Sequence, residues 1–208
     1  MGNQIIEGKT GKEKSMKGLW IGLGVIGVFV VVALLCFGSY VSARNQMVQL
    51  SGDVDRTYSQ LDVVQQRRLD LIPNLVETVK GYVKEESTVL TNIANARAGV
   101  LSAPDRASSI TANQNLSLAL VPFQRLQENY PQLQSNEQFM RLQDEMAGTE
   151  NRIAVERERY NTTLEAYNNY IRMFPNNIWA NMAGFKYKDE YFKGSAESKE
   201  APKVDFSH

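Results

Sequence analysis

The chain has 208 residues and no net formal charge, because 23 Lys and Arg residues balance 23 Asp and Glu residues. The balance leaves no basic surplus for binding nucleic acid, and the sequence contains no nucleic-acid-binding motif. The single cysteine, Cys36, and the single histidine, His208, exclude a disulfide framework, a metal site built on Cys or several His ligands, and Ser-His catalysis. We therefore predict no nucleic-acid partner, no cofactor, no metal site and no catalytic residues.

The N-terminal part of the chain predicts a polar leader followed by a membrane span. Residues 1–17 are polar and show no folding pattern, whereas residues 18–43 contain no charged side chain. A helix of that second length would extend about 39 Å, more than the roughly 30 Å hydrocarbon core of a bilayer. The apolar run is long for a signal peptide and no cleavage site follows it. We expect a single uncleaved span, with Trp20 and Tyr40 as interface anchors.

The charges that flank this span predict its orientation. Four lysines precede it within the leader, whereas only Arg44 and Arg56 lie in the comparable window after it. The positive-inside rule then places the leader in the cytoplasm. We therefore expect a single-pass protein whose domain lies on the extracytoplasmic side of the membrane.

Two amphipathic helices are predicted around Pro73. Apolar residues recur at three- and four-residue steps before and after this proline, which is the pattern of one buried helix face. Proline costs about 3 kcal/mol in a helix interior but little in a first turn, and Asp70 stands where it can cap a new helix. We predict helices over residues 42–69 and 71–101 joined at Asp70 and Pro73, with one kinked helix as the alternative.

Two further helices complete the expected fold. The third, over residues 105–129, begins at a cap within Asp105 to Ser109 and should kink at Pro122. The fourth begins at a capping box that opens with Ser135 and continues to about residue 174. Four helices with short connections predict an all-α fold, in which a transmembrane helix precedes an up-and-down four-helix bundle of long antiparallel helices over residues 44–175.

The fourth helix has a heptad pattern that includes polar residues. Its positions are Phe139, Leu142, Met146, Thr149, Ile153, Glu156, Tyr160, Thr163, Tyr167, Tyr170 and Phe174. We assign Thr149 and Glu156, together with Arg68 and Asn74 of the first two helices, to a polar seam of the bundle. A charge facing a core is costly unless it is paired, so a structural Arg–Glu contact that sets helix register is favoured. The alternative is a ligand or metal pocket, although the glutamates lack the histidines of di-metal bundles.

The C-terminal part predicts an amphipathic segment over residues 176–193. Its aromatic residues and interspersed lysines suit a membrane interface, with Trp179 as an anchor. The alternative is that the segment covers the open end of the bundle. Residues 194–208 are small, charged and proline-containing, and we expect them to be disordered.

Several motifs appear in an order that resembles a known family. They are RRLDLIPNLVETVKGY at 67–82, ARA at 96–98, YPQL at 130–133, GTENRIAVERERYN at 148–161, and FPNN followed by GFKYKDEYF near the C-terminus. Over about residues 40–192 they resemble the LemA family of bacterial membrane proteins. The chain departs from the family pattern in having Leu50-Ser51-Gly52 for Leu-Arg-Asn, and alternating Glu and Arg over 156–159 for a run of arginines. The resemblance implies a helical bundle anchored in the bacterial inner (cytoplasmic) membrane, and no agreed activity.

The predicted function is that of a non-enzymatic, membrane-anchored helical bundle, a self-associating scaffold or adaptor of the bacterial cell envelope. Its expected partners are the lipid bilayer, further copies of the chain and other membrane proteins. The alternative is a ligand- or signal-sensing bundle that uses the polar seam. An unpaired Glu156 in a pocket would favour sensing, and a dry paired contact would favour scaffolding.

Overall fold

A computed structural model describes residues 7–82 and 87–193, with side chains from Trp20 onward except those of Gln124 and Gln127. The first six residues of the predicted leader and the tail over 194–208, for which disorder was predicted, lie outside the described residues.

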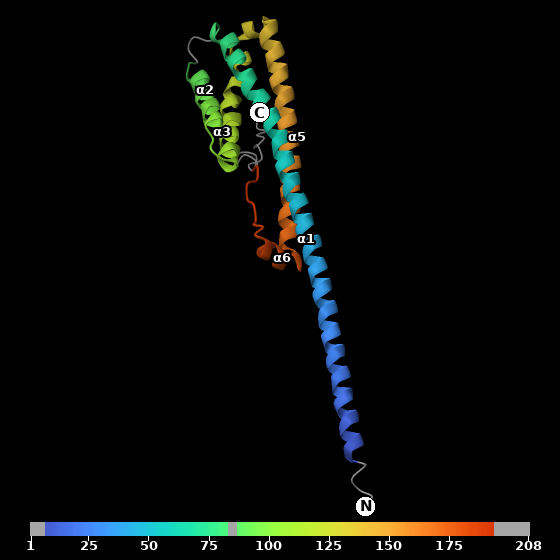
Figure 1. The fold of residues 1–208 in the computed structure, drawn as a ribbon. Coiled ribbons are helices and arrows are strands. Elements are labelled where there is room, and N and C mark those ends of the chain that lie inside the picture. The colour runs from blue at the N-terminus through green and yellow to red at the C-terminus, as the bar shows by residue number, and fades with distance from the viewer. Residues whose placement is uncertain (1–6, 83–86, 194–208) are drawn as a thin grey trace, which may run out of the picture. The chain divides into compact units, whose positions relative to one another are not determined.

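All regular secondary structure in the described residues is helical, as the sequence predicts (Figure 1). A cis peptide bond joins Phe174 to Pro175. In chain order the elements are α1 (Glu7–Lys80), α2 (Ser87–Leu101), α3 (Arg106–Gln124), α4 (Leu126–Asn129), the 3-10 helix η1 (Pro131–Ser135), α5 (Glu137–Arg172) and α6 (Asn176–Ala183).

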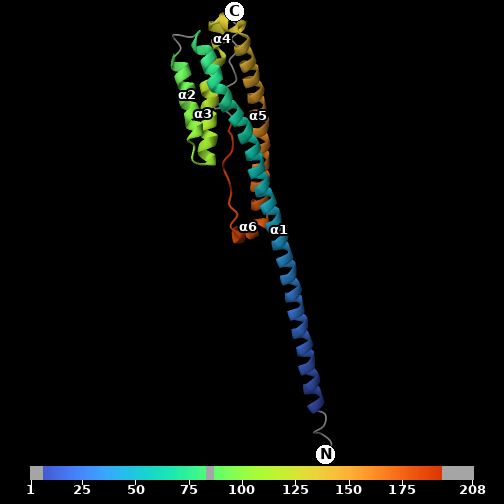
Figure 2. The same ribbon diagram turned by 45° about the horizontal axis from the view of Figure 1, so that its top comes forward.

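The chain divides into two compact units. The first takes α1 up to Gln49 together with Ile171–Lys186, and the second takes Leu50–Tyr170 with the residues from Tyr187 onward. Within the second unit, α1, α2, α3 and α5 alternate in direction, which is the up-and-down bundle that the sequence predicts (Figures 1 and 2). The main apolar cluster of this bundle consists of Leu69, Leu71, Ile72, Leu75, Val79, Ile93, Leu116, Leu120, Phe123, Leu126, Leu133, Phe139 and Met146.

The first unit contains an exposed apolar stretch of α1. Side chains such as Trp20, Phe29 and Leu35 are between 69 and 73% exposed, which is unusual for residues of this type in contact with water. This part of α1 is long and apolar enough to cross a membrane. It is a candidate membrane span at the position that the sequence predicts.

The helix joint predicted at Asp70 and Pro73 is wrong, because α1 continues without a break to Lys80. Pro73 lacks the N–H that would bond the carbonyl four residues earlier, which belongs to Leu69. Arg97 of α2 supplies the replacement, since its Nε donates to the Leu69 carbonyl oxygen at 3.0 Å. Asp70 therefore caps nothing and is exposed, with Gln66 Nε2 donating to its carboxylate. The alternative of one helix through Pro73 is the observed arrangement.

Other helix ends also differ from the predictions. The cap predicted for the third helix is Asp105, whose carboxylate accepts from the Ser108 N–H at 2.8 Å and whose pKa this backbone bond lowers. That helix ends at Gln124, two residues after Pro122, and α4 follows as a separate turn. The fourth helix is capped by Asn136, whose Oδ1 accepts from the Phe139 N–H, rather than by Ser135.

The heptad pattern of α5 changes phase towards its C-terminus. After the buried Tyr160, Tyr167 is buried as predicted, but Leu164 and Ile171 are buried in place of Thr163 and Tyr170, each one residue later than the predicted series. The last predicted position, Phe174, lies beyond the end of α5 at Arg172, in the turn before α6, and is 81% exposed. An α-helix has 3.6 residues per turn, so a straight helix drifts away from a strict seven-residue repeat.

Candidate functional site: a buried arginine network

Arg68 is buried within the second unit. It follows the apolar face of α1, and its side chain is fully buried. Its Nη1 donates to Glu150 Oε1 of α5 at 2.9 Å and to Ser117 Oγ of α3 at 2.8 Å. Its Nη2 donates to Asn113 Oδ1 of α3 at 2.7 Å. One guanidinium therefore bonds side chains from two other helices.

The α3 residues are held in place to accept these bonds. Asn113 Nδ2 donates to the Ser109 carbonyl at 3.0 Å, which directs Asn113 Oδ1 towards Arg68. Ser117 Oγ donates to the Asn113 carbonyl at 3.1 Å and so presents its lone pairs to the guanidinium. Because both acceptors are also bonded to the backbone of α3, the contact with Arg68 costs them little further side-chain freedom.

A second arginine, Arg157 of α5, lies beside this network. Its Nη2 approaches Ser117 Oγ at 3.4 Å, and its guanidinium lies 5.1 Å from the centre of the Phe192 ring. Burial lowers the pKa of Arg157, nearby Arg68 lowers it further, and Glu150 opposes both effects. The Nε atoms of both arginines are buried and have no hydrogen-bond partner among the described residues.

The network holds charge but offers no proton-transfer pair. The Arg68 guanidinium bonds the Glu150 carboxylate and Arg157 is close enough to interact with it electrostatically. A guanidinium stays protonated at any physiological pH. Buried charges of this kind are best attested as devices that set helix register. The arrangement therefore links α1, α3 and α5 at one level of the bundle.

The structure separates the residues that the sequence assigns to the polar seam. Arg68 is buried, and Thr149 is 3% exposed with its hydroxyl bonded to the Glu145 carbonyl of its own helix. Glu156 does not bond Arg68; its carboxylate accepts from Arg159 Nη1, one turn along α5, at 3.0 and 3.1 Å. Asn74 is exposed, so its assignment to the seam is wrong. With α1 continuous, Ile72 and Leu75 carry the buried face instead.

The residues assigned to the membrane interface are partly brought together. The rings of Tyr40 and Trp179 meet edge to face, with centroids 5.7 Å apart. Trp20 remains exposed on α1.

Sequence reasoning missed Glu150, Arg157, Asn113 and Ser117. Their signal is present as spacing. Glu150 and Arg157 are seven residues apart on α5, and Ser109, Asn113 and Ser117 form a polar row at four-residue steps on α3. From the sequence alone, each row looks the same as a polar helix face exposed to water, and only the packing of α3 and α5 on α1 distinguishes the two.

Two asparagines of α5 bind the extended C-terminal segment over residues 187–193. Asn161 pairs with both backbone groups of Phe192, donating to its carbonyl at 2.8 Å and accepting from its N–H at 3.0 Å. Asn168 pairs in the same way with Lys188, at 2.6 and 3.0 Å. An amide side chain carries one acceptor and two donors, so it can satisfy both backbone groups of one extended residue.

A second charged cluster joins α1, α3 and this segment. Arg106 Nη2 bonds Asp55 at 3.0 Å, Arg106 Nη1 lies 3.8 Å from Glu190, and the guanidinium lies 4.2 Å from the centre of the Tyr58 ring. Burial works to lower the pKa of Arg106, but Asp55 and the other nearby charges raise it overall. Neighbouring Tyr160 is fully buried, and burial raises its pKa to about 12.

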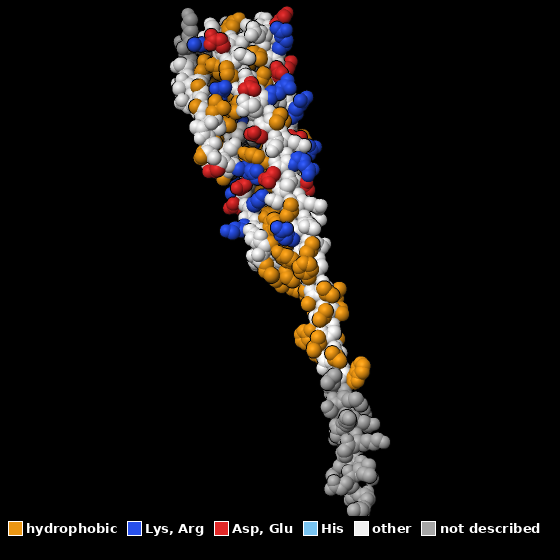
Figure 3. Space-filling view, viewed as in Figure 1, with side chains coloured by type: hydrophobic (Ala, Val, Ile, Leu, Met, Phe, Trp, Pro, Cys, Tyr) orange, Lys and Arg blue, Asp and Glu red, His pale blue; other side chains and the backbone are white. Residues whose placement is uncertain are grey.

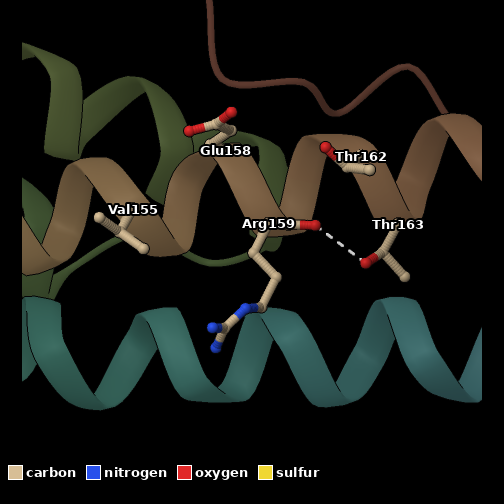
Figure 4. A pocket seen from close by; sticks show the side chains of 5 residues that line it. All are labelled: Val155, Glu158, Arg159, Thr162 and Thr163. Atoms are coloured by element: carbon tan, nitrogen blue, oxygen red, sulfur yellow. Dashed lines mark hydrogen bonds between the residues drawn. The ribbon is translucent and has the colours of Figure 1, made fainter.

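Two surface hollows lie on α5. The smaller, of about 290 Å³, is lined by Val155, Glu158, Arg159, Thr162 and Thr163 (Figure 4). There the Thr163 hydroxyl donates to the Arg159 carbonyl at 2.9 Å. The larger, of about 580 Å³, lies between α5 and the C-terminal segment, and Arg157, Asn161 and Lys193 are among its lining residues. In the part of the chain that the structure describes, no group of three or more His, Cys, Asp or Glu residues is placed to hold a metal ion.

Comparison with known proteins agrees with this architecture. The family model described as the LemA family matches residues 57–206, which is most of the chain. Two curated proteins of Paramagnetospirillum magneticum (strain ATCC 700264 / AMB-1) are similar to it, Magnetosome protein MamQ 1 and Magnetosome protein MamQ 2. Each is 24% identical over 203 residues, covering 83% of this chain and 74% of the relative. The chain belongs to the LemA family of membrane-associated proteins.

Proposed function

We propose that this protein is a non-enzymatic scaffold or adaptor, anchored by α1 in the bacterial inner membrane. One observation carries the proposal. The helix α1 continues without a break from an exposed apolar stretch into a helical bundle, and in that bundle its buried Arg68 is bonded by side chains of other helices. A buried charged side chain that is bonded to other helices is best attested as a structural contact. The similarity to proteins named as magnetosome proteins is consistent with a membrane-associated role.

The proposed partners are the lipid bilayer, other copies of the chain and other membrane proteins. Contact between copies is motivated by the glycines of the span, since small residues let membrane helices approach closely. Gly22, Gly24 and Gly27 have no heavy atom within 4 Å of an added Cβ. Within the part of the chain that the structure describes, a Cβ added at these glycines has no close neighbour, so the effect of a substitution there would report contacts between chains.

Self-association is tested on the full chain in mild detergent by light scattering. We expect a protein mass that is a multiple of 23.4 kDa, and a lower mass for Gly22→Ile. Leu34→Ile, at an exposed position of the same stretch, is the matched control and should leave the mass unchanged. A monomeric mass for the unmodified chain would contradict self-association.

The second candidate function is sensing of a small anion at the buried network. It is favoured by Arg157, where two guanidinium groups share one nearby carboxylate and the larger hollow on α5 gives access. Inorganic phosphate should then raise the melting temperature of the full chain by binding the folded state. The shift should disappear in Arg157→Gln and persist in Arg152→Gln, an exposed control. No shift in the unmodified chain would leave the scaffold as the better account.

A further inference from the structure

The short helix α6 packs beside the apolar part of α1 in the first unit. Its Trp179 ring meets the Tyr40 ring of α1 edge to face, with an interplanar angle of 71°. Gly184 ends the helix in the left-handed conformation, with φ of 79°. A residue with a Cβ would adopt this conformation only with strain. The contact with Tyr40 gives α6 a defined level along α1.

That level coincides with one end of the apolar stretch. From Trp20 to Tyr40 the helix rises about 30 Å at 1.5 Å per residue, which is the thickness of a bilayer's hydrocarbon core. Aromatic residues at the two ends of a span sit at the level of the lipid headgroups. If Trp20 marks one boundary, Tyr40 marks the other, and α6 lies beside it.

The surface of α6 has three distinct faces. Trp179 and Ala180 face inward, and Ala180 is 3% exposed. Ile178 and Met182, one turn apart, are 46 and 69% exposed. Asn177 and Asn181, also one turn apart, are exposed on the next face, about 100° around the helix.

The exposed apolar face extends into the turn that precedes α6. Met173 is 59% exposed and Phe174 is 81% exposed. Figure 3 shows hydrophobic side chains gathered at the α6 end of the first unit and continuing along α1. Such a patch would be a liability in water but is expected at an interface.

We propose that α6 lies in the boundary between the lipid headgroups and the acyl chains of the bilayer that α1 crosses. Phe174, Ile178 and Met182 face the acyl chains, and Asn177 and Asn181 face the headgroups and water. The proposal rests on the span assigned to α1 under the proposed function. It makes α6 a second membrane contact, far from the span in sequence.

The bilayer, rather than a second copy of the chain, is the occupant that the observations favour. The exposed face of α6 is continuous with the apolar surface of α1, which lipid must cover if α1 spans a membrane. A helix with apolar and polar faces side by side is the usual form of an interfacial segment.

The test uses single-tryptophan variants of the full chain in phosphatidylcholine vesicles. Trp20→Phe and Trp179→Phe remove the two native tryptophans and keep an aromatic ring at each position. One further change is then added: Met182→Trp, Asn181→Trp as its neighbour on the polar face, or Phe29→Trp in the middle of the span. Emission is compared in lipids with bromine near the carbonyl end or near the methyl end of the acyl chain, because bromine quenches only nearby tryptophan. Circular dichroism confirms that each variant keeps its helix content.

The expected result separates the three variants. Met182→Trp should lose emission mainly to bromine near the carbonyl end, and Phe29→Trp mainly to bromine near the methyl end. Asn181→Trp should lose little to either lipid and more to acrylamide in the water. Quenching of Phe29→Trp but not of Met182→Trp would overturn the inference and leave the anchor intact.

Other outcomes also decide the inference. Equal quenching of Met182→Trp and Asn181→Trp by the lipids would show that α6 lacks the proposed orientation. Emission from Met182→Trp that neither bromine nor acrylamide reduces would show that protein covers this face. No quenching of Phe29→Trp would remove the anchor, and the inference would fall with it.

Discussion

Glu150 and Glu156 lie six residues apart on α5, but only Glu150 reaches the buried Arg68 guanidinium. The side chain of Glu150 is 27% exposed and Arg68 is fully buried, so removing the carboxylate leaves a charge with neither water nor a counter-ion. Glu156, whose side chain is 18% exposed, instead pairs with Arg159, which is 54% exposed. Removing Glu156 therefore leaves an arginine that water can solvate, and a pair with such a partner contributes little. Similar residues on one helix therefore differ in importance because of what lies opposite them.

The first prediction concerns these two glutamates. Glu150→Ala should lower the free energy of unfolding by about 3 kcal/mol, and Glu156→Ala by about 1 kcal/mol or less. In an Arg68→Met background the cost of Glu150→Ala should fall, because no buried charge remains to be paired. Urea unfolding in mild detergent, followed by circular dichroism, measures each value. Equal losses for the two glutamates would contradict the assignment.

The second prediction concerns Tyr160. Burial raises its pKa from 10.0 to about 12, so between these pH values the folded protein keeps a proton that the unfolded chain has lost. The free energy of unfolding should therefore be unaffected by this group below pH 10 and should fall as pH rises towards 12, by at most about 3 kcal/mol in total. Tyr160→Phe should flatten this decline in the free energy of unfolding, whereas Tyr187→Phe, at an exposed position, should not. An unchanged slope in Tyr160→Phe would be evidence against the buried phenol as its source.

At the scale of the elements, Arg97 explains how α1 passes through Pro73. The freed Leu69 carbonyl belongs to a residue that is 3% exposed, and a buried acceptor without a donor is costly. The side chain of α2 thus repairs a defect in the backbone of α1. This contact gives a physical role to the ARA motif over residues 96–98.

The third prediction tests this repair with a double-mutant cycle. Arg97→Met should lower the free energy of unfolding by about 1–3 kcal/mol, since it leaves the Leu69 carbonyl unsatisfied. In Pro73→Ala, the restored N–H can bond that carbonyl within the helix, so the cost of Arg97→Met should be smaller. Chemical unfolding of the four proteins measures the coupling. Additive effects would show that Arg97 stabilises the bundle in some other way.

The fourth prediction concerns the segment over residues 187–193. Asn161 and Asn168 bond the backbone of Phe192 and Lys188, so replacing either asparagine by alanine exposes those amides. Hydrogen exchange of peptides from this segment should become faster in Asn161→Ala and in Asn168→Ala. Asn169→Ala, at an exposed position on the same helix, is the control. Slow exchange in all three variants would mean that other contacts hold the segment.

At the scale of the whole molecule, the distribution of charge matters more than its sum. The formal charge is zero, but four lysines lie N-terminal to the apolar stretch of α1. The positive-inside rule counts lysines and arginines close to the span and ignores distant charges. It predicts a cytoplasmic N-terminus and an extracytoplasmic domain.

The fifth prediction tests this orientation in cells. Protease added to intact spheroplasts should digest the chain beyond Asn45 and leave the span, as judged by immunoblots against tags at each end. Lysed spheroplasts are the control for access to both sides of the membrane. Protection of the domain in intact spheroplasts would reverse the proposed topology.

The sequence alone determined the helical class and the position of the apolar stretch. Both depend on local composition and on periodicity, which a helix expresses without reference to other elements. The burial of Arg68 was also predictable, because it continues the apolar rhythm of its helix.

Only the tertiary structure decided which side chains contact one another. From the sequence alone Pro73 predicts a helix start, and only the packing of α2 shows that Arg97 bonds the Leu69 carbonyl and lets the helix continue. From the sequence alone Glu156 is as good a candidate partner for Arg68 as Glu150, and only the packing of α5 on α1 shows that Glu150 is the partner. The repeating pattern would bury Phe174, but α5 ends at Arg172, so Phe174 lies in the turn before α6 and is 81% exposed. These outcomes depend on contacts between residues far apart in the chain, and periodicity carries no information about which residues meet.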